Sequence, residues 1–251
     1  MTRPLLPPWP YPRWIAHRGA GLLAPENTLA AFRLGAQHGY RMFECDAKLS
    51  ADGVVLLLHD TELDRTSNGL GRAADQTWAA LSQLDAGSWH SPAYAGEPLG
   101  SLQGLARFCL AQGHHLNIEI KATPGQERET GARVAEKVAA WWSGPSTPPL
   151  LTSFQADALE GARTTAPRLP RGLLRHQWES EVFRLATSLA CQALVCHHSL
   201  WTAERVHQAR AYGLRTLSYT VNEAALAQQL LGWGMDGLIT DRIDLFKPDA
   251  A

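Results

Sequence analysis

Histidine and carboxylate side chains stand at or near the carboxyl ends of short apolar runs in the first quarter of this chain. His17 follows one such run, and His59 follows the β-rich run Val54–Leu58. Glu44 and Asp46 lie within a third run. Because α/β folds place their active sites at the carboxyl ends of strands, we expect these groups to share one site. Imidazoles that titrate near neutral pH can transfer protons, and carboxylates can hold a cation.

Two pairs of charged residues are spaced two positions apart, Glu44 with Asp46 and Glu119 with Lys121. Alternate residues of a strand point the same way, so each pair shares one face. Three carboxylates gathered near two histidines pack poorly without a counter-charge, and a divalent cation would supply it. Oxygen ligands favour Mg²⁺ or Ca²⁺ over zinc. The spacing therefore predicts a Mg²⁺ or Ca²⁺ site formed by these carboxylates.

Formal charges indicate what this site would bind. Three carboxylates and one divalent cation carry one negative charge, and Arg18 with Lys121 brings the sum to one positive charge. A single phosphodiester anion would neutralise that sum. The count assumes that all these residues share one site.

Taken one at a time, these residues have ordinary structural explanations. A carboxylate pair at a strand end can be solvated or can cap a helix, and a histidine followed by aspartate, as at 59–60, is typical of a turn. The segment 240–242 could bind phosphate at the same mouth or could cap a loop. It is the combination of such groups at several strand ends that favours a site.

The overall composition is that of an ordinary globular protein without a charge excess. The chain has 251 residues, with 23 Lys and Arg against 24 Asp and Glu. That balance gives no electrostatic footprint for nucleic acid or an anionic membrane, so an anionic ligand must be held by a local site. The expected partner is a small molecule.

The first twelve residues contain five prolines and are expected to form a lead-in without regular structure. They lack the uninterrupted apolar segment of a secretory signal, and no apolar run is long enough to span a membrane. We therefore expect a cytoplasmic protein. Cys191 with Cys196-His197-His198 fits no strong zinc motif. Other histidines, including His176, are expected at the surface.

Eight apolar runs separated by helical segments begin near residues 14, 42, 116, 150, 172, 193, 214 and 237. Strands that alternate with helices imply parallel pairing with the helices outside. About 250 residues is also the usual length of a (β/α)8 barrel. We therefore predict one TIM-barrel domain over residues 1–251.

The run Val54–Leu58 cannot be a ninth parallel strand, because only a tight turn separates it from the preceding strand. It must run back antiparallel as a hairpin arm. If Leu49 faces Val54, the register places His59 opposite Glu44. The hairpin would then deliver this histidine to the carboxylates.

Residues from about 60 to 100 show no clear alternation of strands and helices. They are rich in glycine and contain one short helical segment near Trp78–Leu84. We predict a small subdomain inserted after the second strand and its hairpin arm.

Together these motifs resemble the glycerophosphodiester phosphodiesterase family, and the resemblance covers almost the whole chain. The matching pieces are His-Arg-Gly at 17–19, Pro-Glu-Asn-Thr at 25–28, Glu-x-Asp at 44–46, Asp-Gly at 52–53, His-Asp at 59–60, Asp-Arg-Thr at 64–66, Asn-Ile-Glu-Ile-Lys at 117–121 and Ile-Thr-Asp at 239–241. Tyr219 departs from the Trp usual in the family, which alters the wall of the site.

The resemblance implies a role for each candidate residue. The implied roles are acid/base pair for His17 and His59, metal ligands for Glu44, Asp46 and Glu119, and phosphate contacts for Arg18 and Lys121. It further implies that the insertion caps the barrel.

The expected activity is metal-dependent hydrolysis of glycerophosphodiesters to glycerol 3-phosphate and an alcohol, a reaction of lipid and glycerol metabolism. Two alternatives stay open. A related barrel phospholipase acting on lysophospholipids would be favoured by an apolar groove at the mouth. A non-catalytic protein that binds a phosphate ligand would require His17 or His59 to be dispensable.

Overall fold

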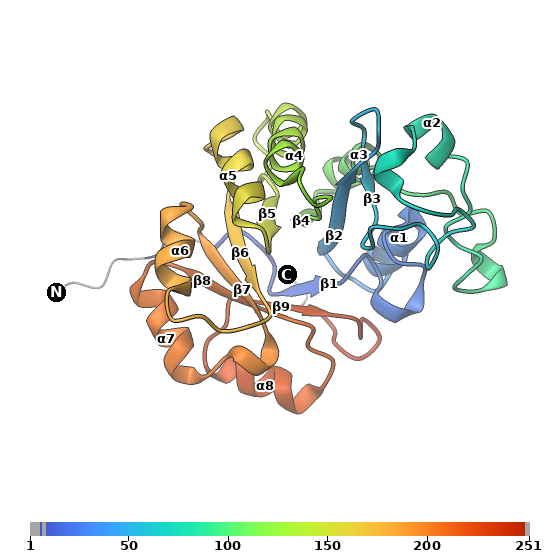
Figure 1. The fold of residues 1–251 in the computed structure, drawn as a ribbon. Helices are drawn as coiled ribbons and strands as arrows, with labels where there is room; N and C mark the ends of the chain where they lie inside the picture. Colours follow the sequence, from blue (N-terminus) through green and yellow to red (C-terminus); the bar gives the residue numbers. More distant parts are fainter. Residues whose placement is uncertain (1–5, 7–8, 249–251) are drawn as a thin grey trace.

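The computed structural model describes residue 6 and residues 9–248, and within them eight parallel strands close into a ring (Figure 1). Strand β1 pairs with both β2 and β9, which closes the barrel. The strands are β1 (Trp14–Ala16), β2 (Met42–Leu49), β4 (His115–Ile120), β5 (Leu150–Ser153), β6 (Arg171–Arg175), β7 (Ala193–His197), β8 (Arg215–Tyr219) and β9 (Gly237–Thr240). The predicted TIM barrel is confirmed.

Helices cover the outside of the ring, as Figure 1 shows. They are α1 (Leu29–Gln37), α3 (Leu102–Gln112), α4 (Glu127–Trp141), α5 (Ala156–Thr165), α6 (Val182–Ser188), α7 (Ala203–Ala211) and α8 (Ala224–Gly232). Hydroxyl side chains cap several of them: Thr28 accepts a hydrogen bond from the Ala31 amide at the start of α1. None of the helices in the described part of the chain is long and apolar enough to cross a membrane.

The barrel interior changes from apolar to polar along the strands. Its amino-terminal end is filled by an apolar cluster of Tyr11, Ile15, Met42, Leu150, Leu174, Ala193, Val195, Leu217 and Ile239. Side chains two positions further along a strand face the same way. Ile15 is therefore followed by His17, Met42 by Glu44, and Ile239 by Asp241. The strand period alone thus directs polar groups into the carboxyl-terminal mouth.

Part of the proline-rich lead-in packs against the other end of the barrel. The Tyr11 side chain is 7% exposed, and its hydroxyl donates a hydrogen bond to the Pro148 carbonyl at 2.7 Å. Residues 9–12 form no helix or strand, as expected for the lead-in, although Tyr11 is packed against the barrel. Residues 1–5 and 7–8 lie outside the described part.

Strand β3 (Val55–Leu57) runs antiparallel to β2, as predicted, but one residue out of the expected register. Leu49 pairs with Val55, not Val54. The loop holds three residues, because the Ser50 amide bonds to the Val54 carbonyl and Gly53 adopts a φ of 74°. A shift of one residue changes the partner of every following position, so His59 is not opposite Glu44.

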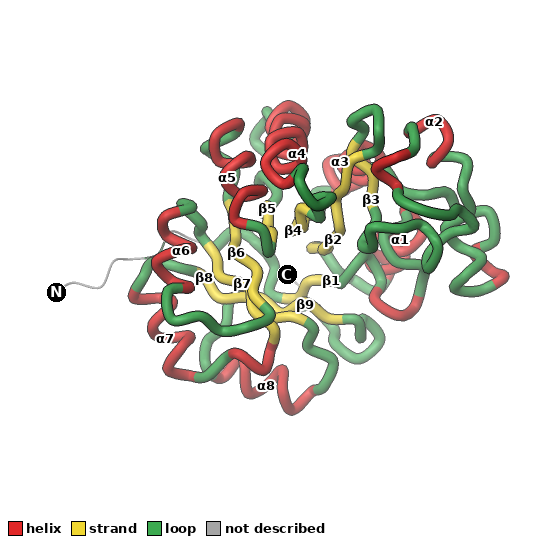
Figure 2. Tube along the Cα trace, in the orientation of Figure 1, coloured by secondary structure: helices red, strands yellow, loops and turns green. Residues whose placement is uncertain are grey.

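The insertion that follows β3 is mostly loop, with the short helix α2 (Trp78–Leu81), as Figure 2 shows. The helix is shorter than the predicted Trp78–Leu84. An apolar cluster that includes Leu58, Leu63 and Leu81 is buried beneath these loops. This small core holds the segment against β3 and beside the mouth of the barrel.

Candidate active site

Three carboxylates converge at the carboxyl-terminal mouth of the barrel. Glu44 and Asp46 lie on β2, and the parallel register pairs Asp46 with Glu119 on β4. One ligand oxygen from each of the three lies within 4.8 Å of the others. Glu44 is only 3% exposed and Asp46 only 1%. The predicted carboxylate cluster is therefore formed, and it is buried.

Burial makes this much negative charge costly. Burial and the neighbouring Asp46 raise the pKa of Glu44 to about 8, and burial also raises the pKa of Glu119. Burial acts on Asp46 in the same direction, but Arg18 and Lys121 outweigh it and lower its pKa. Glu44 Oε1 is buried with no hydrogen-bond partner among the described residues. An unpartnered oxygen within an all-carboxylate ligand set fits a divalent cation.

Two positively charged side chains, those of Arg18 and Lys121, lie against the carboxylate cluster. Arg18 Nε is 3.3 Å from Asp46 Oδ2, and the Arg18 amide donates a hydrogen bond to Glu44 Oε2 at 3.1 Å. Lys121 Nζ is 2.9 Å from Glu119 Oε1 and 3.9 Å from Asp46 Oδ1. The structure therefore places both predicted phosphate-binding residues beside the carboxylates.

His17 follows β1 and is oriented by a carboxylate from the far end of the chain. Its Nδ1 lies 2.6 Å from Asp241 Oδ1, and its Nε2 is 3.8 Å from Glu44 Oε2. Burial lowers the pKa of His17, but Asp241 and Glu44 outweigh burial, and the net shift is upward. Asn222 in turn donates to Asp241 Oδ2 at 3.0 Å. This arrangement holds the second imidazole nitrogen toward the cluster.

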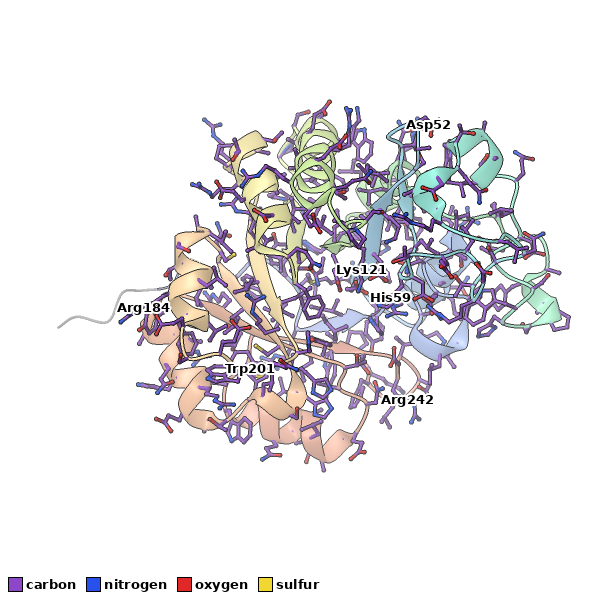
Figure 3. All side chains as sticks on the ribbon, viewed as in Figure 1. Asp52, His59, Lys121, Arg184, Trp201 and Arg242 are labelled. Carbon is purple, nitrogen blue, oxygen red and sulfur yellow. The ribbon has the colours of Figure 1, made fainter. Side chains whose placement is uncertain are left out.

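His59 lies two residues after β3 and, like His17, is paired with a carboxylate. Its Nδ1 lies 2.6 Å from Asp60 Oδ1. Burial, together with Arg18 and Lys121, lowers the pKa of His59. Figure 3 shows His59 and Lys121 in the same central region of the molecule. The two histidines therefore stand in different electrostatic surroundings beside one carboxylate cluster.

Comparison with known proteins decides the family. The model of the glycerophosphoryl diester phosphodiesterase family matches residues 17–245, which is most of the chain. The chain belongs to this family.

Relatives and solved structures agree with this assignment. A glycerophosphodiester phosphodiesterase of Bacillus subtilis is 31% identical over 92% of this chain and 84% of its own. A phosphodiesterase of Oleispira antarctica, solved with the product sn-glycerol-3-phosphate, is 35% identical with a TM-score of 0.87, covering 92% and 93% of the two chains. A glycerophosphodiester phosphodiesterase structure from Agrobacterium tumefaciens is 25% identical with a TM-score of 0.79, covering 94% and 99%. The predicted enzyme class is confirmed.

In this family member, an ion-pair network that sequence reasoning missed connects His59 with Arg18. Arg65 donates to Asp60 Oδ2 at 2.6 Å and to both oxygens of Glu26 at 2.8 and 2.9 Å. Glu26 Oε1 also accepts from Arg18 at 2.8 Å. The network thus runs from His59 to Arg18. The opposite charges of these residues, which lie within the motifs shared with the family, could have indicated the network from sequence.

Two further polar residues hold side chains of the site in place. Asn27 binds Asp46: its Nδ2 donates to Asp46 Oδ2 at 2.8 Å, and its Oδ1 accepts from the Asp46 amide at 3.0 Å. Asp241 was expected to contact phosphate or cap a loop, and it lies against His17. Gly21 permits this, because a Cβ there would collide with the Asp241 backbone.

Proposed function

We propose that this protein hydrolyses glycerophosphodiesters to glycerol 3-phosphate and an alcohol. The observation that carries the proposal is a buried carboxylate cluster beside two histidines, each of which lies against a carboxylate of its own. Support comes from the Oleispira antarctica phosphodiesterase, which shares the fold and was solved with sn-glycerol-3-phosphate. We assign acid/base catalysis to His17 and His59.

Glu44, Asp46 and Glu119 would hold the divalent cation, Mg²⁺ or Ca²⁺. Both ions take carboxylate oxygens as ligands. When bound, the cation would offset the negative charge that develops on the phosphoryl oxygens in the transition state. Arg18 and Lys121, which already contact the carboxylates, would bind the remaining phosphate oxygens.

The histidine pair supplies the two proton transfers that the cleavage requires. One imidazole removes the proton from the attacking oxygen, and the other protonates the departing alkoxide. The glycerol part of the substrate carries a 2-hydroxyl next to the phosphate, and intramolecular attack gains from proximity. We infer that this hydroxyl oxygen bonds to phosphorus as the P–O bond to the alcohol breaks. Water then opens the cyclic phosphate, with the histidines exchanging roles.

The test is release of glycerol 3-phosphate from a panel of glycerophosphodiesters, read through a coupled phosphatase. We expect turnover that stops in chelator and returns with Mg²⁺ or Ca²⁺. Glu44→Gln and Glu119→Gln should abolish the return, whereas Glu129→Gln, an exposed change on α4, should not. Full activity after exhaustive dialysis against chelator would contradict the metal requirement. A lysophospholipid in the same panel tests the alternative phospholipase activity.

A further inference from the structure

A set of aromatic rings occupies the half of the barrel mouth opposite the carboxylates. It follows the carboxyl ends of β5, β6, β7 and β8. We define this aromatic rim as Phe154, His176, His197, His198 and Tyr219. His176, His197 and Tyr219 lie two positions beyond apolar residues of the barrel interior, so the strand period directs them into the mouth.

The rim is continuous and firmly held. The Tyr219 ring lies edge-on to Phe154, with centroids 6.0 Å apart, and edge-on to His197 at 5.8 Å. The Tyr219 hydroxyl donates to the Arg175 carbonyl at 3.0 Å, and Arg175 Nη1 donates to the Phe154 carbonyl at 2.9 Å. These bonds tie β8 to β6 and β6 to β5. The rim is therefore a preformed wall.

Lys121 connects this wall to the catalytic half. Its ammonium lies 5.6 Å from the centre of the Phe154 ring and 2.9 Å from Glu119 Oε1. A phosphodiester held by Lys121 would therefore direct one of its two alcohol arms toward the rim. On the other side of the mouth, the charged groups of Arg65, Glu26 and Asp60 are already paired with one another.

The rim presents imidazole nitrogens more readily than open ring faces. Lys121 lies over Phe154, and the His197 and His198 rings lie 4.1 Å apart at an angle of 35°. His197 Nδ1 pairs with the Ser199 hydroxyl at 2.8 Å, which leaves Nε2. Within residues 9–248, the side chains of His176 and His198 make ring contacts but no hydrogen bond with another residue.

These groups match one kind of alcohol. Esterified glycerol or inositol keeps free hydroxyls, which neutral imidazoles can bind both as donors and as acceptors. Burial, with His197 nearby, lowers the pKa of His198, which favours the neutral form of that ring. An esterified choline carries no hydroxyl, and its trimethylammonium group is best recognised by open aromatic faces. Here the Phe154 face is covered by a lysine.

We propose that the aromatic rim binds the departing alcohol and that His197 selects polyhydroxy alcohols, glycerol and inositol, over choline. The inference rests on the proposed hydrolysis of glycerophosphodiesters. His197 acts as a specificity residue, and the proton transfers stay with the histidines beside the carboxylates.

The experiment compares kcat/KM for glycerophosphoglycerol, glycerophosphoinositol and glycerophosphocholine. We expect the wild type to prefer the two polyol substrates. His197→Phe keeps a ring but removes the nitrogens, and should lower kcat/KM for both polyols by about tenfold while choline changes less than about twofold. His197→Gln, whose amide can replace Nε2, should restore most of the preference. His207→Phe, on the exposed face of α7, is the matched control.

Each outcome decides a different point. Equal losses on all three substrates in His197→Phe, or no loss, would overturn the rim assignment while hydrolysis itself stands. A wild-type preference for the choline substrate would overturn the selection of polyols. If the wild type cleaves none of the three, the proposed function fails and the inference fails with it.

Discussion

Replacing Asp241 by Asn should slow catalysis without disturbing the carboxylate cluster. The Asp241 carboxylate is 2.6 Å from His17 Nδ1, and Asn222 holds its other oxygen. The substitution keeps the shape of the side chain but removes the charge and one acceptor. A hydrogen bond to a charged group contributes about 1.5–3 kcal/mol, which corresponds to a loss of about 10- to 150-fold in kcat.

The assay is steady-state hydrolysis with saturating metal, together with a thermal melt of each variant. Asp244→Asn is the matched control, because Asp244 pairs with Arg242 at the surface of the same loop. KM and metal affinity should change little in Asp241→Asn, since this residue has no contact with the carboxylate cluster. Wild-type kcat in Asp241→Asn would refute the orienting role.

A double variant separates orientation of His17 from a role of Asp241 by itself. If Asp241 acts only through His17, adding Asp241→Asn to His17→Ala should cost nothing more, because coupled residues are not additive. Additive losses in kcat would show that the carboxylate acts elsewhere. Equal losses of thermal stability and kcat in the single variant would point to a structural role instead.

Three further results are expected. Glu44, with a pKa of about 8, is protonated near neutral pH without metal. Metal affinity should therefore rise by up to tenfold per pH unit and level off near pH 8, as calorimetry at several pH values would show. A metal affinity that does not change between pH 6 and 8 would contradict this. His17→Ala and His59→Ala should each lower kcat by at least about 100-fold in the coupled assay, and a tenth of wild-type rate would be too fast for an acid/base role. A substrate lacking only the glycerol 2-hydroxyl should resist cleavage, and turnover at the normal rate would rule out the cyclic phosphate route.

Local patterns were enough to predict the strands and the carboxylate cluster. Glu44 and Asp46 are two residues apart on one strand, so the strand period alone places them on one face. Thr28 carries a capping hydroxyl, and α1 begins directly after it. Each of these features depends on neighbours in the sequence and on a backbone geometry that hardly varies.

Features that depend on exact loop geometry or on distant partners were predicted less well. The register of β3 was wrong by one residue because the loop before Val54 holds three residues, with Gly53 in the left-handed region. Asp241 meets His17 across the seam that closes the barrel, 224 residues away along the chain. The pairing of Glu26 with Arg65 likewise depends on how the insertion folds back. The periodicity of residues within one strand or helix cannot indicate such contacts between distant parts of the chain.

The seam between β1 and β9 has a consequence for when this enzyme can become active. His17 leaves the ribosome well before Asp241 and the strand that positions it, because 224 residues of chain separate the two side chains. A nascent chain therefore carries all three carboxylates of the buried cluster more than 100 residues before it carries the group that lies against His17 Nδ1. Under the proposed mechanism, proton transfer at full rate requires the two ends of the barrel to meet. Turnover could accordingly serve as a direct readout of barrel closure in refolding and co-translational folding experiments.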